Sequence, residues 1–307
     1  MNVHQSVRKS FSISKALLRI VLLCMLMGLM AGCEDIPRRA SQDDGRPVVL
    51  VTIPPLVGIV QEIVGEDIAV HCLMGAGSTP HNFSLKPSDM VKAEQALALV
   101  MVHPHLDDWA SKLRVRHSIQ LIPDEGEHEH AHHHDHGHDH GGVNPHFWSD
   151  PIKVQSTVTN IVIMLGDAMP DYKATFETNG EAFKQTLTEL DAAIQEQVKP
   201  IQGKRAFFFH PSWAYFLERY GIKAMAYIET VPGKPMTPKQ MRDLLELAVQ
   251  KDVSAIFNEV QLPEKPALHL GKETGLPVYT LDPLGTPGES YAALIECNLS
   301  VLLEGLQ

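Results

Sequence analysis

The chain has 307 residues, of which 44% are hydrophobic and 21% charged, a composition typical of a globular protein with two domains or one large one. Its net charge of -11, with no localised basic patch, argues against nucleic-acid binding. Its 4 cysteines are too few for a disulfide scaffold or a thiolate-rich zinc domain. The unusual feature is the histidine content, at 17 residues.

The N-terminus is typical of a secretory signal. Residues 1–19 contain four basic side chains and no acid, and an apolar run from Ile20 to Ala31 follows. This run is too short to span the ~30 Å hydrocarbon core of a bilayer as a stable helix. We therefore expect residues 1–32 to be a signal peptide.

Cys33 stands where a bacterial lipobox places its lipidated cysteine, although Met30 occupies the position that is usually Leu. Lipidation of Cys33 would anchor the protein to a membrane, in the periplasm or elsewhere outside the cytoplasm. The alternative is an ordinary signal with an incidental cysteine. Residues 33–46 are polar and lack periodicity, which predicts a flexible tether.

From Pro47 onward, short apolar runs alternate with helical patterns, which predicts an α/β fold with parallel sheets. Before the histidine-rich region, strands are expected at 47–53, 67–73 and 97–102, with helices at 54–65 and 87–96. After the long helical region, strands are expected at 205–209, 222–228, 254–260 and 277–281, with helices from Ser212, at 238–250, near 263–274 and at the C-terminus.

Between these two halves lies a helical region. Residues 150–168 read as one helix and 170–199 as a longer amphipathic one, which would reach roughly 45 Å. The expected organisation is an N-terminal α/β lobe at 47–169 with a histidine-rich loop at 124–142, a linking helix at 170–200, and a C-terminal α/β lobe at 201–307.

Four candidate metal ligands follow predicted strands or lie in loops between elements: His81, His146, His210 and Asp282. Ligands of parallel sheets lie at the carboxyl ends of strands, and three imidazoles with one carboxylate suit tetrahedral Zn²⁺. Each of the four is adjacent to a proline, which would stiffen its loop. Any one of these histidines alone could have a purely structural role. The occurrence of four candidate ligands at equivalent positions in the two predicted lobes is what indicates a site.

The segments PHNFSLKPSD, NPHFWSDP, FFFHPSWAYF, IFNEVQLPEK and LDPLG resemble, in order, those of the solute-binding lipoproteins of bacterial zinc/manganese ABC importers. This resemblance covers residues 47–307. It implies two α/β lobes joined by a long rigid helix, with metal between the lobes. It also implies a permease and its ATPase as partners, and a monomer.

The same resemblance implies His81, His146, His210 and Asp282 as metal ligands, with water as an alternative to Asp282. Manganese members usually have Glu where this chain has His210, and imidazole shifts the preference towards zinc. The expected function is zinc capture for import. The alternatives are a manganese or broader divalent-metal binder of the same family, and a surface adhesin or metal sensor on this scaffold.

A second metal signal is the tract at 127–140, in which eight histidines alternate with acids. Such a segment cannot form a core, so we expect it to be disordered without metal and to hold several Zn²⁺ ions weakly. It would collect or sense metal for the cleft; the alternative is an insertion with incidental affinity. Its histidines are His128, His130, His132, His133, His134, His136, His138 and His140.

The remaining candidates are weaker. His103 and His105 end a predicted strand, and Glu259 could orient a ligand imidazole or serve a structural role. Cys72 and Cys297 lie in different predicted lobes, and the sequence does not decide whether they form a disulfide. An enzyme is not expected, because the chain lacks HExxH and a G-x-S-x-G elbow.

Overall fold

The computed structural model describes residues 45–75, 77–122, 143–228 and 236–307. The predicted signal peptide, Cys33, nearly all of the predicted tether and the histidine-rich tract at 127–140 lie outside the described residues. Contacts divide the chain after Gly45, and Arg46–Gln307 forms one compact unit. The description below concerns that unit.

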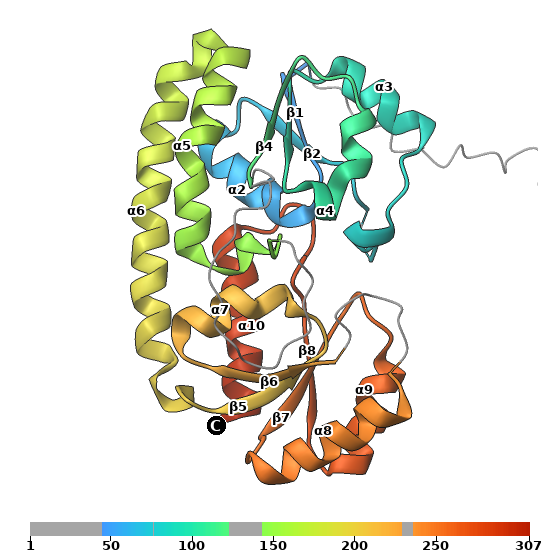
Figure 1. Ribbon diagram of the computed structural model, residues 1–307. Coiled ribbons are helices and arrows are strands. Elements are labelled where there is room, and N and C mark those ends of the chain that lie inside the picture. The colour runs from blue at the N-terminus through green and yellow to red at the C-terminus, as the bar shows by residue number, and fades with distance from the viewer. Residues whose placement is uncertain (1–44, 76, 123–142, 229–235) are drawn as a thin grey trace, which may run out of the picture. The chain divides into compact units, whose positions relative to one another are not determined.

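The N-terminal lobe is built on a parallel four-stranded sheet with the order β2-β1-β3-β4 (Figure 1). Its central strand β1 is buried and apolar, and Val49 pairs with Val70 on one side and with Ala98 on the other. The strands are β1 (Val48–Val51), β2 (Ala69–Cys72), β3 (Ala98–Met101) and β4 (His117–Gln120). The helices are α2 (Pro54–Val64), α3 (Pro87–Gln95), α4 (Pro104–Asp107) and α5 (Pro151–Ala168).

The C-terminal lobe repeats this topology with a parallel sheet in the order β6-β5-β7-β8. β7 is buried along its whole length, as expected for a central strand covered on both faces. The strands are β5 (Arg205–Phe208), β6 (Lys223–Tyr227), β7 (Ala255–Glu259) and β8 (Val278–Leu281). The helices are α7 (Ala214–Tyr220), α8 (Pro238–Gln250), α9 (Glu264–Thr274) and α10 (Tyr291–Leu306).

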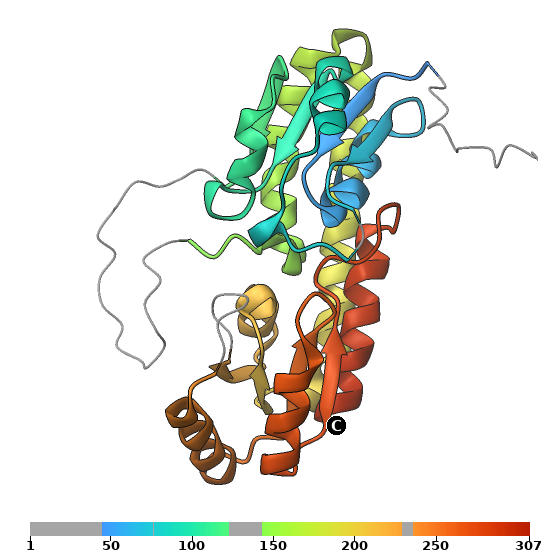
Figure 2. The ribbon, with the colours of Figure 1, turned by 90° about the vertical axis from the view of Figure 1, so that its right-hand side faces the viewer.

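The helix α6 (Lys173–Gln197) connects the lobes and runs beside both of them (Figures 1 and 2). Its 25 residues correspond to about 37 Å. Phe176, Phe183 and Ile194 recur at helical spacing and are buried in one hydrophobic core that extends through both lobes. Gly180 lets α6 approach α5 closely, because a Cβ there would lie 2.6 Å from Cγ2 of Val162.

The lobes also contact each other directly. The indole Nε1 of Trp148 donates to the carbonyl of Pro283 at 2.7 Å, and the Tyr291 hydroxyl donates to the carbonyl of Trp148 at 2.9 Å. In α2, a Cβ on Gly58 would lie 2.7 Å from the backbone nitrogen of Tyr291, so this contact requires glycine. The lobes are therefore held together by packing as well as by α6.

The predicted parallel α/β lobes and the long linking helix are confirmed by this architecture. The sequence-based expectation omitted β4, whose residues are HSIQ and carry no apolar run.

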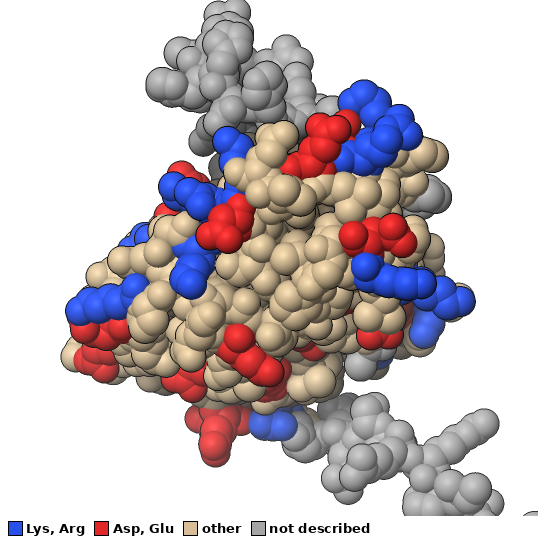
Figure 3. Space-filling view, turned by 90° about the horizontal axis from the view of Figure 1, so that it is seen from below, with Lys and Arg blue, Asp and Glu red and all other residues tan. Residues whose placement is uncertain are grey.

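None of the described helices is both long enough and apolar enough to cross a membrane. The face below the C-terminal lobe carries basic and acidic side chains intermixed rather than a field of one sign (Figure 3).

Candidate metal centre

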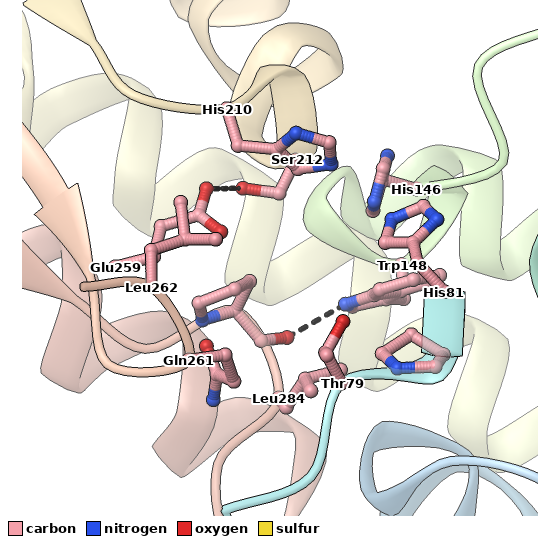
Figure 4. Close-up of a pocket in the computed structure, with 12 residues that line it drawn as sticks. Thr79, His81, His146, Trp148, His210, Ser212, Glu259, Gln261, Leu262 and Leu284 are labelled. Carbon is pink, nitrogen blue, oxygen red and sulfur yellow. Dashed lines mark hydrogen bonds between the residues drawn. The ribbon is translucent and has the colours of Figure 1, made fainter. Parts of the chain in front are cut away.

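Three histidines converge between the two lobes. One ligand nitrogen from each of His81, His146 and His210 lies within 4.8 Å of the others. Their ring centroids are 5.0–5.8 Å apart, and the rings face a common space (Figure 4). They are the only group of potential metal-ligating side chains of this kind within the described ranges. The structure therefore brings together the three histidines that the sequence analysis selected.

His81 belongs to the 3₁₀ helix Pro80–Asn82, between β2 and α3. Trp109 holds this turn in place: its Nε1 donates to the carbonyl of Pro80 at 3.2 Å, and its ring lies 4.5 Å from that of Phe83. His81 is the most exposed of the three and lies at the solvent edge of the site, although the surrounding protein still removes part of the water around its imidazole.

His146 precedes the 3₁₀ helix Phe147–Ser149 and is only 5% exposed. The next two side chains, Phe147 and Trp148, are buried and anchor the segment. Asp150 then caps α5 by accepting from the backbone nitrogen of Ile152 at 2.8 Å. This sequence of anchors places the imidazole of His146 at the cavity wall.

His210 comes from the opposite lobe, directly after the central strand β5, and is also 5% exposed. The preceding Phe209 continues the sheet by donating its backbone N–H to Phe257 at 2.9 Å. The following Ser212 donates its hydroxyl to Oε1 of the buried Glu259, at the end of β7. Figure 4 shows His210, Ser212 and Glu259 on one side of the cavity.

The cavity between the histidines has a volume of about 20 Å³, enough for roughly one water molecule or one metal ion. Glu259 and Gln261 line the same cavity. The Oε1 atom of Gln261 is buried and accepts no hydrogen bond from the described residues. A carboxyl group beside the imidazoles would also balance part of the charge of a divalent cation.

Asp282 lies directly after β8, at the same edge of its sheet, but outside the three-histidine group. Its Oδ1 accepts from Nε2 of Gln261 at 2.7 Å and from the backbone nitrogens of Leu284 and Gly285 at 3.1 and 3.0 Å. Oδ1 is thus already engaged in a turn. Ligation by Asp282 stays a prediction.

The electrostatic environment disfavours protonation of the histidines. Burial lowers the pKa of His81, and it lowers the pKa of His146 further, well below the ordinary value. The neighbouring His210 and His81 rings add to the effect at His146, because two imidazolium cations at this separation would repel. The neutral forms that are favoured are the forms that bind metal.

His103 and His105 are not part of the group. His103 is buried, and its Nδ1 accepts from the backbone nitrogen of His105 at 3.1 Å. The neighbouring Asp107 accepts from Thr52 Oγ1 at 2.7 Å, and burial raises the pKa of its carboxyl. These residues fix the end of β3. Cys72 and Cys297 are both free thiols, so the disulfide that the sequence left open is not formed.

Asn144 and Gln261 are among the residues at the site that the sequence analysis did not select. Asn144 hydrogen-bonds to His146, and Gln261 lines the cavity. The only sequence signal for either was its place inside a quoted motif, two residues from a candidate ligand for Asn144 and two residues after Glu259 for Gln261.

The family model described as zinc-uptake complex component A, periplasmic (ZnuA), matches residues 49–305. The chain belongs to the ZnuA family. Among curated relatives, the zinc-binding lipoprotein AdcA of Streptococcus pneumoniae R6 is 26% identical, over 94% of this chain and 60% of that protein. The metal ABC transporter substrate-binding lipoprotein SsaB of Streptococcus sanguinis is 25% identical, over 93% and 97% of the two chains. This ZnuA-family chain thus spans about 60% of the length of the first of these relatives.

Solved structures show the same fold. A crystal structure of ZnuA superposes with a TM-score of 0.73 at 23% identity, covering 85% of this chain and 100% of that chain. The laminin-binding protein Lmb of Streptococcus agalactiae, described as having adhesin and metal-transporting activity, gives a TM-score of 0.73 at 22% identity, with 85% and 100% covered. The two-lobed architecture of this ZnuA-family chain is therefore a known one.

Proposed function

We propose that this chain is the zinc-binding component of a bacterial ABC importer, which captures Zn²⁺ outside the cytoplasm and delivers it to a membrane permease and its ATPase. The observation that carries the proposal is the convergence of three imidazoles, from both lobes, within 4.8 Å. Membership of the ZnuA family supports the transport role. Binding and release of an ion, rather than catalysis, is the activity proposed.

Zinc is favoured over manganese by the chemistry of the donors. Three nitrogen ligands suit Zn²⁺, whereas Mn²⁺ prefers carboxylate and water oxygens. The decisive residue is His210, which is buried and directed at the cavity, where a carboxylate would favour the harder ion. The curated relatives include both zinc-binding and manganese transporter proteins, so donor chemistry is what separates the two.

For the fourth ligand we propose either Asp282 or a water molecule. Asp282 Oδ1 is held by three hydrogen bonds, so ligation requires its other oxygen or a rearrangement of the turn. A metal-bound water would have a candidate acceptor in Gln261, which lines the cavity and whose buried Oε1 accepts no hydrogen bond from the described residues. Gln261 also donates to Asp282, so it connects the two alternatives.

The remaining parts of the proposal rest on the sequence. A lipid at Cys33 would hold the protein at a membrane surface, and residues 33–46 would let it reach the permease. The tract at 127–140 would gather zinc near the cleft. We expect the protein to act as a monomer without nucleic-acid partners.

The test is a calorimetric titration of the purified, metal-stripped protein with Zn²⁺ and with Mn²⁺. His210→Ala removes one proposed ligand, and His269→Ala, an exposed histidine on α9, is the matched control. One tight zinc site should be present in the wild type and in His269→Ala and lost in His210→Ala, with weaker Mn²⁺ binding throughout. Tight zinc binding that survives His210→Ala and disappears only when residues 127–140 are deleted would contradict the proposal.

Transport is tested in the source organism under zinc limitation. A strain that lacks the gene should regain growth with the wild-type protein but not with His210→Ala. If both proteins restore growth equally, or if the wild type binds laminin and has no effect on zinc uptake, an adhesin role would replace the transport role.

A further inference from the structure

Asn144 stands at the junction between two of the proposed ligands. Its Oδ1 lies 2.6 Å from Nδ1 of His146 and accepts from the backbone N–H of His146 at 3.0 Å. Its Nδ2 donates to the carbonyl of Pro211 at 2.9 Å, directly after His210. Its own carbonyl accepts from the Tyr215 hydroxyl at 2.9 Å.

These contacts determine which way the Asn144 amide faces. A backbone N–H can only donate, so the atom facing His146 N must be oxygen. A backbone carbonyl can only accept, so the atom facing Pro211 O must be the amide nitrogen. Each end of the amide is thus fixed by an independent backbone partner, and the reversed orientation would lose both bonds.

The orientation of Asn144 in turn determines the tautomer of His146. Because Oδ1 has no proton to give, the 2.6 Å contact is a hydrogen bond only if Nδ1 of His146 carries the proton. In a neutral imidazole the lone pair is then on Nε2. Nδ1 is occupied by Asn144, so Nε2 is the nitrogen left for a ligand in the cavity.

We propose that Asn144 is a positioning residue that holds His146 as its Nδ1–H tautomer, with Nε2 presented to the metal, and that it ties His146 to the segment carrying His210. This inference rests on the proposed zinc function. The bond to Pro211 makes the two ligands from opposite lobes share one support, so the spacing of the cavity is set before the ion arrives. Tyr215 strengthens the same junction without touching His146.

The test uses ¹⁵N-histidine NMR on the metal-free full-length protein, with the His146 signals assigned by their loss in His146→Gln. Three variants separate the roles of the junction. Asn144→Ala removes acceptor and donor, Asn144→Asp keeps an acceptor for Nδ1–H but loses the donor to Pro211, and Tyr215→Phe removes only the bond to the Asn144 carbonyl. Zinc affinity is measured on each by chelator competition, after thermal unfolding has confirmed that each variant folds.

We expect the wild type, Asn144→Asp and Tyr215→Phe to show the Nδ1–H tautomer, and Asn144→Ala to shift towards Nε2–H. Zinc affinity should fall about 10–100-fold in Asn144→Ala, by less in Asn144→Asp, and little in Tyr215→Phe. An Nε2–H tautomer in the wild type, or a tautomer unchanged in Asn144→Ala, would overturn the proposal. Because the tautomer is read without metal, a wild type that shows Nδ1–H but binds no zinc would instead refute the proposed function.

Discussion

Zinc affinity should depend on pH less steeply than three ordinary histidine ligands would require. Three histidines with pKa values of about 6.5 would lose roughly 10³-fold in apparent affinity between about pH 7.5 and about pH 5.5, because zinc must displace a proton from each. The sequence alone predicts this steep fall below about pH 6.5.

The structure predicts a smaller loss of zinc affinity over this pH interval. Burial lowers the pKa of His81, and burial together with the neighbouring rings lowers the pKa of His146 well below the ordinary value. A group with a lowered pKa binds its proton only at lower pH, so competition with zinc begins later. If His146 stays neutral over the whole interval, the loss should be about 10²-fold or less, since each ordinary histidine accounts for roughly tenfold.

The assay is competition with a chelator of known pH-dependent zinc affinity, on a variant that lacks residues 127–140, so that its eight histidines do not contribute. A fall of about 10³-fold would show that protons compete with zinc at three ordinary histidines and would contradict this prediction. The same shifts make an independent prediction for the metal-free protein. The unfolded chain takes up protons below about pH 6.5 while folded His81 and His146 resist them, so stability to heating should decrease as the pH falls through that value.

Four further variants test the packing of the fold and the separation of the tight zinc site from the tract at 127–140. Gly58→Ala places a Cβ 2.7 Å from the backbone nitrogen of Tyr291, the first residue of α10, so overpacking of about 1–3 kcal/mol should outweigh or cancel the roughly 1 kcal/mol gained in helix propensity. Gly166→Ala meets only a lysine side chain at 3.1 Å and should be neutral or up to about 1 kcal/mol stabilising by thermal unfolding. Arg219→Met removes the 2.7 Å bond to the Asp191 carboxylate and should destabilise the fold by about 1–3 kcal/mol in urea unfolding, and an unchanged midpoint would argue against the ion pair as a link between α7 and α6. Deletion of 127–140 should abolish the weak zinc sites in calorimetry while the tight site remains, and loss of the tight site would place it in the tract.

The sequence predicted those helices and strands that are marked by a pattern of apolar residues within the element itself. The buried strands β1, β3 and β7 are apolar runs, and α6 carries its apolar residues at helical spacing. β4 was missed because an edge strand with one neighbour is not required to be apolar, and His117–Gln120 is mostly polar.

At the site, too, some features could be predicted from the sequence and others could not. His210 was found because it follows the predicted strand at 205–209, and His81 and His146 because they lie beside prolines in loops between predicted elements. The sequence could not show how the side chains at the site are oriented. Asp282 occupies an equivalent position, yet its Oδ1 is drawn into the turn formed with Leu284 and Gly285. The link from Asn144 to the segment that carries His210 is a hydrogen bond across 67 residues of sequence, and such a contact leaves no local pattern.

The central claim is that one zinc ion binds between the lobes on His81, His146 and His210. It is tested most directly by a crystal structure of the protein loaded with one equivalent of Zn²⁺, with anomalous diffraction at the zinc edge. We expect a single strong peak about 2.0–2.1 Å from one nitrogen of each histidine, with Nε2 as the ligand atom of His146. A peak elsewhere, or one that lacks His210, would contradict it.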